Sequence, residues 1–524
     1  MVIRKPRKRS FFRVVLPYLG VLALVAITVV IILALMGPRI GNVFSNISKG
    51  LSRDGGGGNY VYVAPPVVQP TPFLAGTYQN YGVNPVISTA QDHLSTFAMD
   101  VDTASYTLAR SYLIGSRQMP PVDAIRPEEF INYIPTHYAP PTSDRAFAIH
   151  LEASTSPFVE SGSLLLRVGI QGKVIAPEDR DPATLIFVID VSGSMEAPNR
   201  LALVKESLAV LVPQLRADDL IGIVTYSNTA QLILNPTTAS NQQTILDAIA
   251  SLHTEGSTLA EAGLALGYDV ARQYIHKDST TRVILLSDGV ANVGATGPAQ
   301  ILETIRHGAE SGVTLTSIGV GMGDYNDVMM EQLANDGNGN YFYVDDVREA
   351  QRVFVYNLTS TLQVIGYDAK IQVDFNPNVV SQYRLIGYEN RAVADTDFRN
   401  DKVDAGEVGT GHSVTALYEL TLKPNTTGTI ATAQIRYQDA DTRVVIEQRE
   451  GFSTEEVGTR FESMSSDFQL QAAAAELAEL LRGSQFAVNG SYDTVLSAAL
   501  PLISHEMYAA EIGQMAKIAQ EVRP

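Results

Sequence analysis

Apolar residues between positions 184 and 362 gather in short runs that do not follow the regular alternation of half-buried strands, and helical patterns separate these runs. The runs are 185–189, 220–224, 283–286 and 313–320. Runs of this kind are typical of strands buried on both faces. Between them, apolar residues recur every three or four positions, which predicts helices. Strands that alternate with helices predict a Rossmann-like, doubly wound α/β domain with a mostly parallel sheet, which we place at residues 181–363.

Apolar residues follow a period of two on both sides of this region. The alternating segments are 147–153, 164–170, 371–375, 414–422 and 431–437. This period predicts half-buried strands. The segments before the α/β region are too few to bury a sheet face alone. We therefore expect one β-sandwich, split into residues 146–180 and 364–455, with the α/β domain inserted between its two parts.

The remaining segments have patterns of their own. Residues 95–145 are expected to form a mixed α/β segment with a short helix at 105–116. Residues 456–524 repeat apolar side chains at helical spacing, and Gly483 is expected to end one of these C-terminal helices. Residues 37–94 are rich in Gly and Pro and lack a sustained period, which predicts a flexible stalk.

The N-terminus combines a basic stretch with a long apolar run. Residues 1–13 contain six Lys or Arg, and residues 14–36 contain no charge. A run of this length spans ~30 Å of hydrocarbon at ~1.5 Å per residue. The positive-inside rule then predicts a single-pass anchor in the cell membrane, with residues 1–13 in the cytoplasm and the bulk of the chain outside it. A cleaved signal peptide is the alternative, but its apolar region usually has ~7–15 residues.

Charge and composition narrow the classes of function. The chain of 524 residues has 38 Lys or Arg and 56 Asp or Glu. Eight of the basic residues lie within 1–50, which contain no acid, so residues 51–524 have a net charge of −26. A body this acidic repels nucleic acid and anionic lipid surfaces. Cysteine is absent, which excludes disulfides, thiolate metal sites and a cysteine nucleophile.

Oxygen-bearing side chains follow the predicted strands. Asp190, Ser192 and Ser194 come after the first apolar run, Thr258 opens a helical pattern, and Asp288 follows a third run. Ligands bind at the carboxyl ends of strands in open α/β sheets. Alone, Thr258 fits a helix N-cap and Asp288 a turn residue. Together, two carboxylates and three hydroxyls suit a hard divalent cation such as Mg²⁺ and leave a coordination position for an acidic group of a partner.

The pattern Asp-x-Ser-x-Ser, then Thr, then Asp resembles the metal-ion-dependent adhesion site (MIDAS) of von Willebrand factor A (VWA) domains. The resemblance covers about residues 184–362. It implies that Ser192, Ser194 and Thr258 supply hydroxyl ligands. It also implies that Asp190 and Asp288 bind the metal directly or through water, and that a partner's Asp or Glu takes the open position. The expected cofactor is Mg²⁺, with Mn²⁺ and Ca²⁺ as alternatives.

Sequence blocks outside that region resemble a narrower bacterial group, the YfbK-like VWA proteins. These blocks are 100–106, 126–133 and 401–407. They extend the resemblance to about residues 95–520. This second resemblance therefore supports the expected architecture. It does not imply a biochemical activity for the chain.

These observations predict a membrane-anchored VWA protein of the bacterial cell envelope that binds a protein partner and is not an enzyme. An envelope assembly or chaperone scaffold using the same site is the first alternative. A metal-dependent hydrolase is the second, although the sequence contains no zinc-hydrolase histidine pair, Gly-x-Ser-x-Gly elbow or phosphate-binding loop. The identity of the partner and the oligomeric state stay open.

Overall fold

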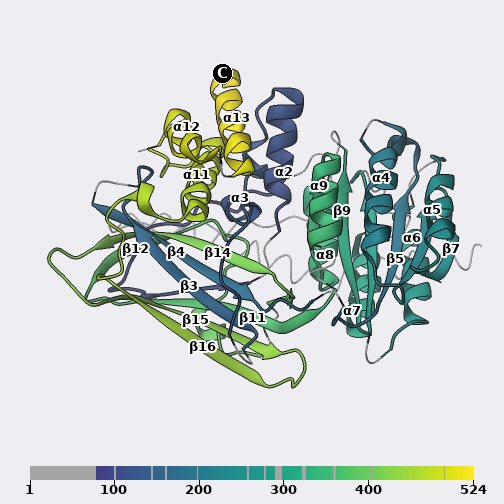
Figure 1. The fold of residues 1–524 in the computed structure, drawn as a ribbon, viewed down its shortest axis with the longest axis horizontal. Helices are drawn as coiled ribbons and strands as arrows, with labels where there is room; N and C mark the ends of the chain where they lie inside the picture. The colour runs from purple at the N-terminus through teal and green to yellow at the C-terminus, as the bar shows by residue number, and fades with distance from the viewer. Residues whose placement is uncertain are drawn as a thin grey trace, which may run out of the picture. The chain divides into compact units, whose positions relative to one another are not determined.

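A mostly parallel sheet and a two-sheet sandwich organise the chain (Figure 1). The computed structural model describes residues 78–99, 102–142, 145–159, 162–176, 178–197, 199–256, 259–276, 279–289, 298–321, 326–357, 362–401, 403, 405–488, 490–504 and 506–523. All of them belong to one unit, Pro72–Pro524. The predicted N-terminal anchor, residues 14–36, lies outside the described residues.

The parallel sheet has the strand order β10-β9-β8-β5-β6-β7. Its strands are β5 (Ala183–Asp190), β6 (Leu220–Tyr226), β7 (Ala230–Thr238), β8 (Thr280–Ser287), β9 (Val313–Val320) and β10 (Tyr341–Val344). Only β7 runs antiparallel, at one edge. The expected mostly parallel α/β sheet is therefore confirmed. The sequence patterns missed β7, which is largely exposed, and β10, which has only four residues.

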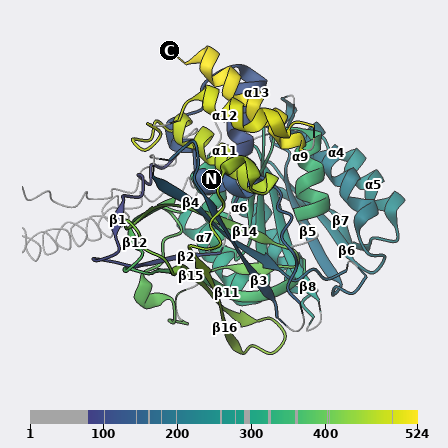
Figure 2. The same ribbon diagram turned by 60° about the vertical axis from the view of Figure 1, so that its left-hand side comes forward.

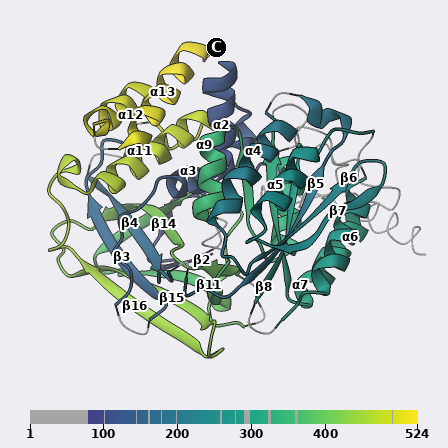
Figure 3. The ribbon, with the colours of Figure 1, turned by 45° about the vertical axis from the view of Figure 1, so that its right-hand side comes forward.

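Helices cover both faces of this sheet, as can be followed in Figure 3. One face packs against α4 (Leu201–Leu211), α5 (Gln242–Ser251) and α9 (Val347–Gln351) with its π-helical continuation η5 (Arg352–Asn357). The other packs against α6 (Ala260–Arg272), α7 (Pro298–Glu310) and α8 (Asp327–Asp336). Successive residues of β5 enter opposite cores: Phe187 joins the first and Val188 the second. This is why the strand has no polar alternation.

The sandwich consists of two antiparallel sheets around one apolar core. The first has the order β1-β12-β14-β4-β3, and the second β13-β11-β15-β16 with β2 paired to β11. The strands are β1 (Ile87–Ser88), β2 (Leu94–Ala98), β3 (Phe147–Ser154), β4 (Ser163–Gly172), β11 (Val364–Phe375), β12 (Val380–Ile386), β13 (Glu407–Gly409), β14 (Ser413–Leu422), β15 (Thr429–Asp439) and β16 (Val445–Ser453). Because β4 precedes the parallel sheet in the chain and pairs with β14, which follows it, the α/β region is an insertion in the sandwich.

The predicted stalk, residues 37–94, extends too far toward the C-terminus. Residues 78–94 fold onto the sandwich, and Figure 2 shows β1 beside β12 at the edge of its sheet. The Asn84 side chain donates to the Gly387 carbonyl at 2.6 Å, and the buried Thr89 hydroxyl donates to the Val380 carbonyl at 2.6 Å. These contacts involve polar side chains and backbone, so they leave no apolar period in the sequence. Residues 37–77 lie outside the described part.

Helices from both ends of the described chain cover the outer face of the first sandwich sheet (Figure 1). They are α2 (Ala104–Arg110) with its π-helical continuation η1 (Ser111–Gly115), α3 (Pro127–Tyr133), α11 (Ser466–Leu481), α12 (Tyr492–Ala499) and α13 (Met507–Val522). The expected C-terminal helices are present. Gly483 follows α11 with φ of 68°, a left-handed conformation that suits glycine after a helix end.

In the described part of the chain, no helix is both long and apolar enough to cross a bilayer.

A buried acid on α11 gives the fold a pH dependence that can be measured. Glu476 is 5% exposed, and its Oε1 has no hydrogen-bond partner among the described residues. Burial, followed by the charges of Glu479 and Glu419, raises the pKa of Glu476 from 4.5 to about 8. Because the folded state binds this proton more tightly than the unfolded state, the contribution of Glu476 to the free energy of unfolding falls as pH rises from about 4.5 to 8.

Glu476→Gln should therefore stabilise the protein at pH 9, by roughly 2–4 kcal/mol, and change little at pH 5. Urea unfolding at both pH values measures this. Glu450→Gln, at an exposed position on β16, is the matched control and should leave the difference between the two pH values unchanged. If the free energy of unfolding depended on pH equally in Glu476→Gln and in wild type, the raised pKa of Glu476 would be contradicted.

Candidate metal centre

The predicted site residues lie at the carboxyl edge of the parallel sheet. Asp190 is the last residue of β5, and Asp288 directly follows β8. The two strands are parallel neighbours, with Ile189 beside Leu286. Both carboxylates therefore leave the sheet at the same edge, next to each other.

The loop after β5 gathers the two serine hydroxyls. The Ser192 N–H donates to Asp190 Oδ1 at 2.8 Å, and the 3-10 helix η3 (Gly193–Glu196) follows at once. This turn places Ser192 Oγ and Ser194 Oγ 3.0 Å apart. Two hydroxyl oxygens this close can both coordinate one small cation.

Asp190 is buried and lies in a polar environment. Its Oδ2 accepts hydrogen bonds from Ser287 Oγ at 3.1 Å and from the Tyr226 hydroxyl at 3.3 Å. Burial, and to a smaller extent the charge of Asp288, raises the pKa of Asp190 to about 6. A desolvated carboxylate beside a second carboxylate favours a bound cation. The donor set and its charge thus fit a divalent metal ion.

Asp288 also contacts an arginine that the sequence patterns did not single out. Arg200 Nη1 donates to Asp288 Oδ2 at 2.5 Å and to the Ser194 carbonyl at 2.9 Å. One guanidinium nitrogen therefore bridges the two loops of the site. A single arginine before α4 belongs to no spacing pattern that could be recognised in the sequence. Its contact with Asp288, 88 positions away, becomes visible only in the fold.

The fifth predicted ligand, Thr258, lies outside the described residues together with Ser257. The residues just before this pair contact the loop after β5. The Gly193 N–H donates to the Gly256 carbonyl at 3.0 Å, and the Glu255 N–H donates to the Val191 carbonyl at 2.5 Å. Gly256 has φ of 50°, and a Cβ there would lie 2.3 Å from Asn228 Nδ2, so the position favours glycine.

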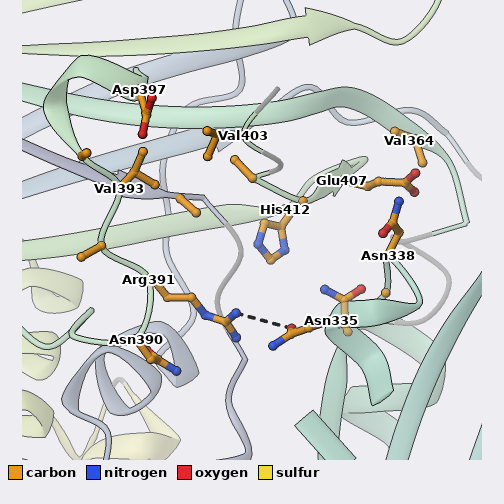
Figure 4. A pocket seen from close by; sticks show the side chains of 18 of the residues that line it. Asn335, Asn338, Val364, Asn390, Arg391, Val393, Asp397, Val403, Glu407 and His412 are labelled. Atoms are coloured by element: carbon orange, nitrogen blue, oxygen red, sulfur yellow. Dashed lines mark hydrogen bonds between the residues drawn. The ribbon is translucent and has the colours of Figure 1, made fainter. Parts of the chain in front are cut away.

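A cavity of about 400 Å³ opens at the opposite edge of the parallel sheet (Figure 4). It lies between the start of β8 and β10 and the sandwich, and Arg391, Asn335 and His412 point into it. Arg391 Nη1 donates to Asn335 Oδ1 at 3.4 Å. None of the four predicted metal ligands that the structure describes lines this cavity.

A histidine and two carboxylates also lie close together at two helix N-termini. His137 Nδ1 is 2.7 Å from Asp467 Oδ1, and Glu506 is close to both. Asp467 is in the first turn of α11 and Glu506 is the N-cap residue of α13. The hydrogen bond to Asp467 raises the pKa of His137, so an ion pair at the helix ends accounts for this group.

Comparison with protein families finds matches along most of the chain. Residues 184–355 match the family model for the von Willebrand factor type A domain. Residues 73–166 match one described as "von Willebrand factor", and residues 360–522 one described as "Uncharacterized protein YfbK, C-terminal". YfbK of Escherichia coli (strain K12) is 37% identical over 447 residues, which cover 80% of this chain and 76% of YfbK.

The chain belongs to the YfbK family. More distant relatives of this family member include human inter-alpha-trypsin inhibitor heavy chain H3, which is 27% identical over 46% of the chain and 29% of its own length. Among solved structures, a von Willebrand factor type A protein from Catenulispora acidiphila is 16% identical, with a TM-score of 0.40 over 73% of this chain and 88% of that one. VWA domains typically have a divalent-metal MIDAS site and commonly mediate protein–protein interactions.

Proposed function

We propose that this YfbK-family protein binds a protein partner through a divalent cation in its VWA domain. The main support is the convergence of four predicted ligands, Asp190, Ser192, Ser194 and Asp288, at one edge of the parallel sheet. The order and spacing of these residues in the sequence already indicate a shared ligand, and their proximity in the fold is independent support for it.

The proposed ligands divide into charged and neutral donors. Asp190 and Asp288 supply the charge that attracts the cation, and Ser192, Ser194 and Thr258 supply neutral oxygens. When bound, Mg²⁺ supplies a Lewis-acid contact for a carboxylate of the partner. With only two carboxylates from the protein, the cation keeps affinity for this third acidic group.

The predicted apolar segment 14–36 supports a membrane tether, with the basic residues 1–13 in the cytoplasm. We propose that the VWA domain is thereby presented outside the cell membrane. On a membrane surface, several weak metal-mediated contacts can act together and raise the overall affinity.

An envelope assembly or chaperone scaffold would use the same metal contact and differ only in what happens to the partner after it is bound.

A hydrolase needs a nucleophile and a base beside the metal ligands. Among the described residues, no hydrogen bond joins Ser192 or Ser194 to a histidine. We therefore propose a binding protein and not an enzyme.

The test is capture by the tagged full-length protein from host membranes, in Mg²⁺ and in chelator. A partner should be retained in Mg²⁺ and lost in chelator, and Ser194→Ala should reduce its recovery by ~10-fold or more, because one metal donor is gone. Ser240→Ala, which removes an exposed hydroxyl after β7, should capture like wild type. Partners whose recovery is the same in chelator and in Ser194→Ala would contradict the proposal.

A further inference from the structure

We propose that a small cavity beside α3 binds a calcium ion, separately from the proposed metal centre of the VWA domain. The cavity has a volume of about 70 Å³, and its lining includes the first turn of α3, the loop after β12 and residues 79–83. The four predicted VWA ligands that the structure describes do not line it. The calcium ion holds residues 79–83, near the start of the described chain, on the folded unit.

Two buried oxygen atoms of residues that line this cavity accept no hydrogen bond in the described part of the chain. They are Glu128 Oε2, on α3, and Asn390 Oδ1, in the loop after β12. Glu128 is only 2% exposed. A buried acceptor without a donor is unfavourable unless water or an ion contacts it. Two such atoms at one cavity therefore point to a bound ligand that contacts oxygen.

The loop after β12 lies directly against α3. Gly387 has φ of 77°, and a Cβ there would lie 2.4 Å from Glu128 Oε2, so the loop backbone passes close to this carboxylate. The Asn132 side chain, one turn further along α3, donates to the Tyr388 hydroxyl at 3.0 Å. These contacts bring the next two residues of the loop, Glu389 and Asn390, to the cavity.

Glu389 supplies a second carboxylate at the cavity. Its side chain is 8% exposed. In the described part of the chain, its Oε1 accepts from the Asn84 N–H at 3.2 Å and from Arg482 Nη1 at 3.1 Å, and neither contact uses Oε2. Burial, and next the charge of Glu389, raises the pKa of Glu128 to about 7. The two carboxylates thus repel each other, and a cation removes this repulsion whereas a water molecule does not.

The charges around the cavity favour a cation. The lining contains three acids and two arginines, namely Asp123, Glu128, Glu389, Arg126 and Arg482. The arginines are shared with acids outside the lining, because Arg126 pairs with three of them and Arg482 with one. Of these four acids, Glu331 and Glu479 each have one further arginine in the described part of the chain. The acids therefore stay in excess.

Calcium suits this set of donors better than magnesium. Ca²⁺ takes ~6–8 oxygen ligands from carboxylates, amide carbonyls and waters, and it tolerates irregular geometry. Glu128 and Glu389 supply negative charge, and Asn390 supplies a neutral oxygen. A buried water needs only ~10–15 Å³, so the cavity has room for an ion and for waters that complete its coordination.

Residues 79–83 form one wall of the cavity. The Asn80 side chain donates to Asp123 Oδ1 at 2.7 Å, and the Asn84 side chain donates to the Gly387 carbonyl at 2.6 Å. The Asn84 N–H also contacts Glu389, which is a proposed calcium ligand. Since the segment docks on the same residues that hold the ion, removal of the ion weakens its docking.

The experiment is a calorimetric titration of the full-length protein with Ca²⁺ at pH 8, above the pKa of Glu128. It uses Asp190→Asn as the parent, so that Ca²⁺ at the VWA centre does not contribute. Adding Glu128→Gln should weaken Ca²⁺ binding by at least ~10-fold, because a ligand is lost. Adding Asn390→Ala should also weaken it, although both carboxylates remain. Glu450→Gln, at an exposed position on β16, is the matched control and should bind like the parent.

Hydrogen exchange of residues 79–84 is the second measurement. Ca²⁺ should slow this exchange in the parent and leave it unchanged after Glu128→Gln. That variant should fold, because burial disfavours the charged form that it removes. Absence of Ca²⁺ binding by the parent would mean that the cavity holds water only, and would overturn the calcium site. Equal Ca²⁺ binding after Glu128→Gln would also overturn it. Neither result bears on the proposed VWA metal centre, which is tested with Mg²⁺ in the wild-type protein.

Discussion

Asp190→Asn should weaken Mg²⁺ binding by at least ~100-fold. The substitution keeps the shape of the side chain and removes the buried charge at the end of β5. Since Ser192 and Ser194 are neutral, Asp288 would be the only remaining carboxylate among the predicted ligands, and Arg200 already pairs with it. Loss of a ligand should exceed the 10–100-fold loss typical of residues that only support ligands. Calorimetric titration with Mg²⁺ and Mn²⁺ measures the change.

The fold should survive this substitution. The raised pKa of Asp190 means that its charged form is disfavoured by folding, so a neutral amide relieves that penalty. The amide oxygen can still accept from the Ser192 N–H, which now donates at 2.8 Å. The urea midpoint should therefore stay close to that of wild type. Asp247→Asn, at an exposed position on α5, controls for loss of charge and should keep full Mg²⁺ affinity. Unchanged affinity in Asp190→Asn would refute the metal centre.

The location of Asp190 and Asp288 could be predicted because it follows from strand direction alone. Runs of buried apolar residues identify parallel strands, and parallel strands place their carboxyl ends at one edge. The same reasoning does not find β7. Its residues are largely exposed and antiparallel because it closes the sheet at an edge, so they lack the apolar run that identifies β5, β6 and β8.

Arg200 and Thr89 show why other features could not be predicted. Each makes its decisive contact with a residue far away in the chain, Asp288 for Arg200 and Val380 for Thr89. A single polar residue has no period, so its partner emerges only when the fold is known. This also explains why the stalk was predicted too long.

Buried arginines are another feature that the sequence patterns did not identify. Arg126 is 5% exposed and precedes α3. Its guanidinium pairs with Glu129 of the same helix, and with Asp327 and Glu331 of α8, both at 3.1 Å. Arg126 therefore joins the N-terminal helical segment to the α/β region through one buried group of charges.

Arg126→Met should lower the free energy of unfolding by about 3–5 kcal/mol at pH 7.5. Methionine fills part of the space but removes the cation that Glu129, Asp327 and Glu331 share, and of the three only Glu331 has a second arginine, Arg391 at 3.3 Å, in the described part of the chain. A buried charge that loses its partner is strongly destabilising. Urea unfolding measures the change. Arg306→Met, which breaks the exposed pair with Asp336, should cost less than about 1 kcal/mol and serves as the control.

The deficit of Arg126→Met should shrink as the pH falls toward 5. Burial already raises the pKa of Glu129 and Asp327 in the presence of Arg126, and loss of its positive charge raises both further. The folded variant then takes up protons at a higher pH than the unfolded chain, so acidification stabilises it relative to wild type. A deficit below 1 kcal/mol at pH 7.5, or one that grows on acidification, would show that Arg126 does not compensate these carboxylates.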